Sequence, residues 1–142
     1  MIKVDLGGLN DVQNSLNSLE KALDTTAILD EAGALLFART RQRFLKQVEP
    51  DGTPWVESYG AKHRRAIGRG GGTLYDTGHL FRSIQLYTVG GNTRAIGTNV
   101  PYAIDHQYGI GLVRRKFLGF SDEDLSLVTK LIVARIDREF AK

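Results

Sequence analysis

The first apolar side chains of the chain recur at alternating steps of three and four residues: Leu9, Val12, Leu16, Leu19 and Leu23. They therefore share one face of a helix. A second helical pattern covers about residues 26–48 and ends before the turn sequence at residues 50–54, Pro-Asp-Gly-Thr-Pro. The break at Asp24 and Thr25 fits either two antiparallel helices or one long bent helix.

Further along, apolar and polar residues alternate from Ser83 to Val89, and a Gly-Gly-Asn turn leads into residues 93–98. This pattern predicts a β-hairpin. Residues 102–108 are expected to form one irregular turn. Asp76, Thr77 and Gly78 predict a tight turn in which Asp or Thr caps a short helix.

The clearest helix signal lies at the C-terminus. Ser121 is a typical N-cap and three acidic residues follow it in the first turn. An apolar face follows: Leu125, Val128, Ile132, Ile136 and Phe140. The order of elements predicts an α+β fold, with N-terminal helices and a C-terminal helix packed on a small antiparallel β-sheet, in a single domain over residues 1–142.

Residues 56–73 interleave glycines with basic residues and hold few apolar anchors, which predicts a long, basic, Gly-rich and mobile surface loop. A second basic cluster follows the hairpin. The basic residues expected to face a partner or a polyanion are Lys62, Arg64, Arg65, Arg69, Arg114 and Arg115.

The chain has 142 residues, 42% of them hydrophobic, and no cysteine. This excludes disulfides, thiolate metal sites and a cysteine nucleophile. No stretch approaches the ~18 apolar residues of a membrane span, and the N-terminus shows no secretory signal. Formal charge is −4 over residues 1–32, +8 over 33–119 and −1 over 120–142. Such polarity suits a polyanion partner, or acidic ends of one subunit meeting the basic middle of the next.

Candidate chemistry is sparse. His79 and His106 could combine with Asp76 or Asp105, but their spacing matches no metal or catalytic motif. The glycine run at residues 68–72 lacks the Gly-Lys-Ser/Thr ending of a phosphate loop. The sequence therefore predicts no enzyme, no cofactor and no metal. Trp55, the only tryptophan, fits the core better than an interface.

Four segments in order resemble the phage virion morphogenesis family, the tail-completion proteins of contractile-tailed phages and prophages. They are Phe44 with the turn that ends in Pro54-Trp55; residues 74–84, LYDTGHLFRSI; residues 95–103, AIGTNVPYA, with HQYG at 106–109; and residues 115–121, RKFLGFS. Lys116 stands where the family's R-P-F-L-G run has proline. The family-motif frame comprises Trp55, Asp76, Thr77, Gly78, Leu80, Ile84, Gly97, Tyr102, Ala103, Gly109, Phe117 and Leu118.

The resemblance implies a structural protein of the virion tail or neck, made in the host cytoplasm, that acts in tail completion and head–tail joining by stoichiometric binding. Its implied partners are tail-tube and neck proteins, further copies of itself in an oligomer such as a ring, and DNA contacted non-specifically in the assembled bore. From the residues alone, the alternative is a free nucleic-acid-binding protein that uses the basic loop at residues 62–69.

Overall fold

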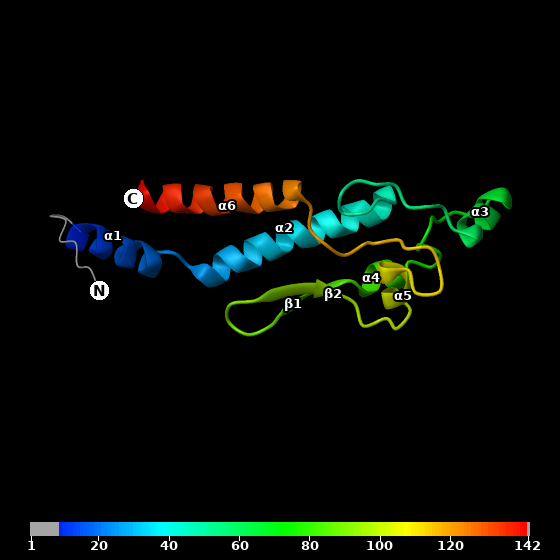
Figure 1. Cartoon of the computed structure of the whole chain (residues 1–142), viewed down its shortest axis with the longest axis horizontal. Coiled ribbons are helices and arrows are strands. Elements are labelled where there is room, and N and C mark those ends of the chain that lie inside the picture. The colour runs from blue at the N-terminus through cyan, green and yellow to red at the C-terminus, as the bar shows by residue number, and fades with distance from the viewer. Residues whose placement is uncertain (1–8, 142) are drawn as a thin grey trace.

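The computed structural model describes residues 9–141, so residues 1–8 and residue 142 lie outside it. Figure 1 shows an elongated chain built around one long central helix, α2 (Thr25–Lys46), with the C-terminal helix α6 (Asp122–Phe140) on one side and a β-hairpin on the other. Helix α1 (Leu9–Ala22) and the C-terminal end of α6 lie at one end of the molecule, and α3 (Tyr59–Ala66) lies at the other.

The two N-terminal helices are separate and not antiparallel. In Figure 1, α1 and α2 follow each other in the same direction along the long axis, and the antiparallel neighbour of α2 is α6. The break is fixed by Asp24, whose side chain accepts a hydrogen bond from the Ala27 N–H at 3.0 Å and so caps α2. The side chains of Leu9, Val12 and Leu16, which share a face in the sequence pattern, lie outside those described.

The predicted hairpin forms between β1 (Gln85–Thr88) and β2 (Arg94–Gly97), which pair antiparallel with Leu86 opposite Ile96. It packs against α2 at Gly33. A Cβ added there would lie 3.0 Å from a methyl carbon of Leu86, so glycine allows the close approach of helix and sheet. With helices at both ends of the chain and this small antiparallel sheet, the predicted α+β class is confirmed.

The core is small and aromatic, and Phe44 lies at its centre. The Phe44 ring centroid is 5.1 Å from Trp55, 5.6 Å from Phe81 and 5.8 Å from Phe117. The indole N–H of Trp55 donates to the Lys116 carbonyl at 2.9 Å, so this buried polar group is paired. The core therefore joins the end of α2 to segments that follow it by 11 to 73 positions.

Two segments differ from the prediction. Residues 59–66, expected to be part of a loop, form helix α3, because Ser58 caps it by accepting the Ala61 N–H at 3.1 Å. Residues 102–108, expected to be irregular, contain helix α5 (Ala103–Tyr108), which ends at Gly109 with a φ of 70°. Both helices are one or two turns long, which leaves too few residues for an apolar period to show.

The short helix predicted after Asp76, Thr77 and Gly78 is present as α4 (His79–Ser83). The N-cap position of α4 is Gly78, with a φ of 81°, and not Asp76 or Thr77. Thr77 Oγ1 instead accepts the His79 N–H at 3.3 Å. Leu80 and Phe81 of α4 are buried in the core.

Candidate functional surfaces

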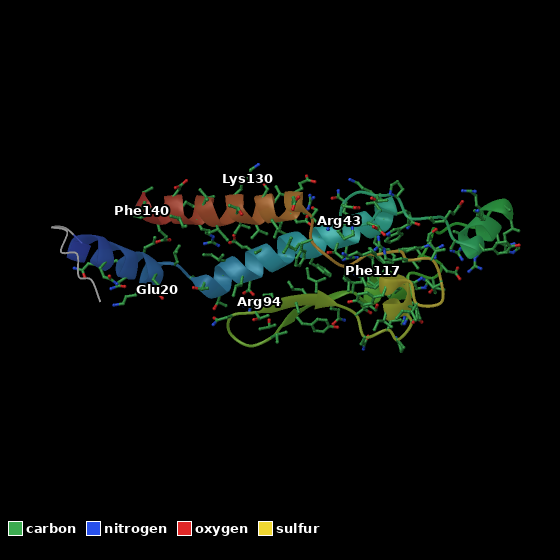
Figure 2. All side chains as sticks on the ribbon, in the orientation of Figure 1. Glu20, Arg43, Arg94, Phe117, Lys130 and Phe140 are labelled. Carbon is green, nitrogen blue, oxygen red and sulfur yellow. The ribbon has the colours of Figure 1, made fainter. Side chains whose placement is uncertain are left out.

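A carboxylate at the start of α6 attaches this helix to α2. Asp124 is fully buried and accepts hydrogen bonds from both Arg39 and Arg43 of α2. It also accepts the Ser121 N–H at 2.9 Å, while Ser121 Oγ accepts the Asp124 N–H at 3.1 Å, which completes a capping box. Figure 2 shows Arg43 on α2 beside the first turn of α6. One side chain therefore caps a helix and joins it to its neighbour.

The electrostatics of this cluster favour the ionised form of Asp124. Burial by itself raises the pKa of Asp124, but the hydrogen bonds from Arg43, the Ser121 N–H and Arg39 outweigh it and lower that pKa to about 2. The pKa of Arg39 is raised, chiefly by its hydrogen bond to Asp124. Sequence analysis missed this cluster because Arg39, Arg43 and Asp124 each resemble ordinary helix-surface charges.

The basic residues of the first cluster mostly pair with acidic neighbours. Arg65 Nη1 lies 2.6 Å from Glu57, and Arg69 Nη2 lies 3.1 Å from Asp76. Arg64 donates to the Gly72 carbonyl at 2.8 Å and its side chain is largely buried. The prediction that Arg64 belongs to an exposed basic surface is therefore wrong. Instead, Arg64 holds the glycine segment back against α3. Lys62 is exposed on α3.

The second basic cluster, at residues 114–116, likewise contains one buried arginine and one exposed arginine. Arg115 is buried and donates through Nε to the Val56 carbonyl at 2.7 Å, so the prediction that it faces a partner is wrong. Its length lets the guanidinium reach under the neighbouring loop, which the sequence pattern does not reveal. Arg114 is exposed and lies 3.4 Å from Glu49.

Residues of the family-motif frame mostly surround the core. Buried positions among them are Trp55, Gly78, Leu80, Ile84, Ala103 and Phe117, and Leu118 packs against these. Tyr102 departs from the expected frame, because it is 45% exposed with its ring edge against His106. Gly97 has no positive φ, and no heavy atom lies within 4 Å of the position of an added Cβ. A Cβ on Gly109 would lie 3.0 Å from Arg114 Cβ, so glycine is required there.

Gln107, which the residue predictions did not include, connects two of the motif segments. Its Oε1 accepts the Phe117 and Leu118 N–H groups at 3.1 and 3.0 Å, and its Nε2 donates to the Leu118 carbonyl at 2.8 Å. Residues 117–118 belong to no β-strand, so their backbone groups are not paired with a neighbouring strand. The side-chain amide of Gln107 supplies the hydrogen bonds that such a strand would otherwise provide. The only sequence signal was the position of Gln107 inside the HQYG segment.

Only some of the histidine and aspartate residues considered as catalytic candidates lie close to one another. A hollow of about 230 Å³ is bordered by Asp76, His79 and His106, together with Arg64 and Tyr102. His106 Nδ1 is buried without a hydrogen-bond partner, and burial followed by the nearby Arg115 lowers the pKa of this imidazole. Within residues 9–141, no hydrogen bond links the two histidines to either aspartate, and no cluster of three or more acidic or histidine ligands could hold a metal.

Large parts of the apolar surface lie uncovered. The chain exposes 9700 Å², whereas a compact monomer of 15.7 kDa exposes about 7300 Å². Most of the exposed large apolar side chains lie along α6 and around α5 with the loop after it, where Tyr108 is 69% exposed. Over the described residues, no helix is long and apolar enough to cross a membrane. Exposed apolar patches are typical of protein interfaces.

These features define a class of protein: an elongated α+β protein with a small aromatic core, whose polar clusters hold its own segments together and which exposes large apolar side chains along α6 and around α5. The model of the phage virion morphogenesis family matches residues 7–137. The chain belongs to this family, as its motifs predicted. Membership indicates a structural role in virion assembly. Comparisons with curated proteins and with solved structures gave no match.

Proposed function

We propose that the protein completes the phage tail and joins it to the head through stoichiometric binding, and that it is not an enzyme. The observation that carries the proposal is the family match over residues 7–137, combined with exposed apolar surface along α6 and around α5. An assembly subunit covers such surfaces only when its partners are in place.

The internal polar clusters support binding rather than catalysis. Arg39, Arg43 and Asp124 pair with one another, and Gln107 pairs with backbone, so these groups are used to hold the fold. A catalytic acid or base needs a hydrogen-bonded partner that orients it beside a substrate. His106 faces the hollow near Asp76 without any such partner among the described residues.

The proposed partners are the tube protein at the end of the tail and a protein of the neck. Exposed apolar side chains around α5, such as Ile104, Tyr108 and Ile110, offer one contact surface for them. An exposed basic residue such as Lys62 suits a position near DNA that passes through the neck. In this proposal the protein stays in the virion, at the tail or neck, after assembly in the host cytoplasm.

Deletion of the gene in the phage or prophage that encodes this chain tests the proposal. Electron microscopy of the lysate is expected to show filled heads and full-length tails that remain unjoined. Expression of the wild-type chain in trans should restore joined particles. Joined, infectious particles in the deletion lysate would contradict the proposal, as would a defect limited to DNA packaging.

A further inference from the structure

Two buried side-chain nitrogens within residues 9–141 have no hydrogen-bond partner: Arg64 Nε and His106 Nδ1. Both belong to side chains that line one hollow, the space of about 230 Å³ that Asp76, His79 and Tyr102 also border. An unpaired buried polar group costs free energy, and folded proteins pair nearly all such groups. Two exceptions on the walls of one hollow therefore indicate an occupant that supplies the missing partners.

Three short helices supply the walls of the hollow. Arg64 comes from α3, His79 from α4 and His106 from α5. The Arg64 side chain is held by its hydrogen bond to the Gly72 carbonyl at 2.8 Å. On the opposite wall, the Arg115 N–H donates to the His106 carbonyl at 2.8 Å. Contacts within the chain therefore hold both side chains at the hollow, and such preorganisation favours binding.

Guanidinium groups outnumber carboxylates on the side of the hollow formed by α3 and α4. Asp76 is the acidic residue of the lining, and its Oδ1 lies 3.1 Å from Arg69 Nη2 but 3.7 Å from Arg64 Nε. Arg82 adds a third guanidinium, which donates to the Thr77 carbonyl at 2.9 Å on the rim. One carboxylate therefore faces three arginines.

The α5 side of the hollow is also positively charged. The guanidinium of Arg115 is buried and donates to backbone carbonyls, and none of the ion pairs found within residues 9–141 includes it. The pKa of His106 is lowered, first by burial and then by Arg115, while Asp105 raises it by less. The potential at His106 therefore favours a negatively charged group nearby.

A carboxylate has the hydrogen-bonding groups that these walls lack. The Nε–H of Arg64 always donates, and His106 Nδ1 donates when it carries the ring proton, so the two oxygens of a carboxylate can accept from both. Its single charge meets less repulsion from Asp76 than the double charge of a phosphate would. The hollow is smaller than the roughly 300 Å³ at which small-molecule sites begin, so it suits one side-chain-sized group.

We propose that this hollow binds a carboxylate group between Arg64 Nε and His106 Nδ1. Small side-chain rotations, which commonly accompany binding, bring the two nitrogens within hydrogen-bond distance of it. The carboxylate is either an acidic side chain of a protein that contacts the neighbouring surface of α5, or a small free acid. This inference goes beyond the proposed function, because it holds whether or not the chain joins heads to tails.

The test uses the full chain, whose three histidines provide an internal reference. His79 and His106 line the hollow, whereas His63 is exposed on α3 and does not line it. The imidazole signals are followed by NMR at constant ionic strength during titration with acetate, a free carboxylate. A second titration uses the amide of N-acetylglutamate, which presents the same group as a protein side chain does. The amide of N-acetylglutamine is its neutral control, and inorganic phosphate is the competing anion.

Both carboxylates should shift the His106 signal until it saturates and leave that of His63 in place. A bound anion stabilises the imidazolium, so the pKa of His106 should rise on binding, and binding should tighten as the pH falls through that pKa. Tighter binding of the glutamate compound would identify a protein side chain as the source, and equal or tighter binding of acetate a free acid. Arg64→Gln should weaken binding at least about tenfold. Arg65→Gln is the matched control, because Arg65 is 72% exposed and lies outside the hollow.

The wild-type titrations decide the proposal even if Arg64→Gln does not fold. No saturable shift at His106, or an equal shift at His63, would overturn it. So would a glutamine compound that shifts His106 as strongly as the glutamate one, or phosphate that binds more tightly than both carboxylates. The unjoined heads and tails of the gene deletion are a separate readout, so either proposal can fail without the other.

Discussion

Arg43 of α2 donates a hydrogen bond to Asp124, 81 positions later in the chain, at the first turn of α6. Both residues are buried, and Arg39 binds the second oxygen of the same carboxylate. A buried carboxylate between two arginines is stable only when all three are present, because removal of one leaves an uncompensated charge. The attachment of the C-terminal helix therefore depends on this cluster.

Asp124→Ala is expected to lower the free energy of unfolding by about 3–5 kcal/mol, because it leaves two arginines without their carboxylate and removes the acceptor of the Ser121 N–H in the capping box of α6. Urea denaturation followed by circular dichroism measures this loss. Glu123→Ala is the matched control in the same turn: its side chain is 73% exposed, so its ion pair with Arg39 should contribute less than about 1 kcal/mol. Equal losses in the two variants would contradict the role assigned to Asp124.

The stability should also depend on acid through Asp124. Its pKa is about 2 in the folded chain and about 3.9 in an unfolded one, so the folded state favours the ionised form. This carboxylate therefore contributes on the order of 2 kcal/mol above about pH 5, and the contribution is lost as the pH falls towards 2. Unfolding curves at several pH values should show the wild type losing its advantage over Asp124→Asn across this window. A constant difference between them would contradict the assignment.

Gln107→Ala is expected to cost about 2 kcal/mol, since it leaves the N–H groups of Phe117 and Leu118 without their acceptor. A protonated Gln107→Glu side chain can still accept these N–H groups and donate to the Leu118 carbonyl, so in mildly acidic solution its loss should be smaller than that of alanine at the same pH. Thermal unfolding of both variants checks the order. If alanine were tolerated better than glutamate, the two N–H contacts would not be the stabilising ones.

Trp55→Phe should destabilise the chain by about 1–2 kcal/mol, because the Lys116 carbonyl loses its indole donor and the site loses volume. Unfolding followed by circular dichroism measures the change. Tyr59→Phe is the control, since Tyr59 is 89% exposed and should be neutral. In the wild type, the emission of this single tryptophan should be blue-shifted until the core unfolds.

The free nucleic-acid-binding alternative predicts tight, steeply salt-dependent binding of DNA by the isolated chain. We expect the opposite. Arg65, Arg69 and Arg114 are each paired with an acidic residue, so binding to a labelled duplex at physiological salt should be weaker than about 10⁻⁶ M. Fluorescence anisotropy at several salt concentrations measures it. Submicromolar binding that weakens steeply with salt would favour the alternative.

The long periodic elements were predictable from sequence, because each carries its own local signal. The Ser121 cap, the α6 helix and the hairpin lie where the pattern places them. The sequence correctly predicted that α6 is a helix with an apolar face, but it did not predict that much of this face is exposed. Leu125 and Phe140 face solvent in the single chain, since periodicity shows which residues share a face and not what covers that face.

The remaining features depend on contacts far apart in sequence. Arg115 looks identical to Arg114 in the sequence, yet one is buried against Val56 and the other is exposed. The pairing of Arg43 with Asp124 joins two helices whose relative position no local pattern encodes. The family motifs located the core segments, but not the amide of Gln107 that ties two of them together.

The most direct test of the central claim, that this chain is a structural part of the virion, is its position and amount in purified particles. Quantitative mass spectrometry should find the chain in finished virions at a fixed number of copies per particle, and immunogold labelling should place it where the tail meets the head. Its absence from finished particles, or labelling confined to another part of the virion, would contradict the account.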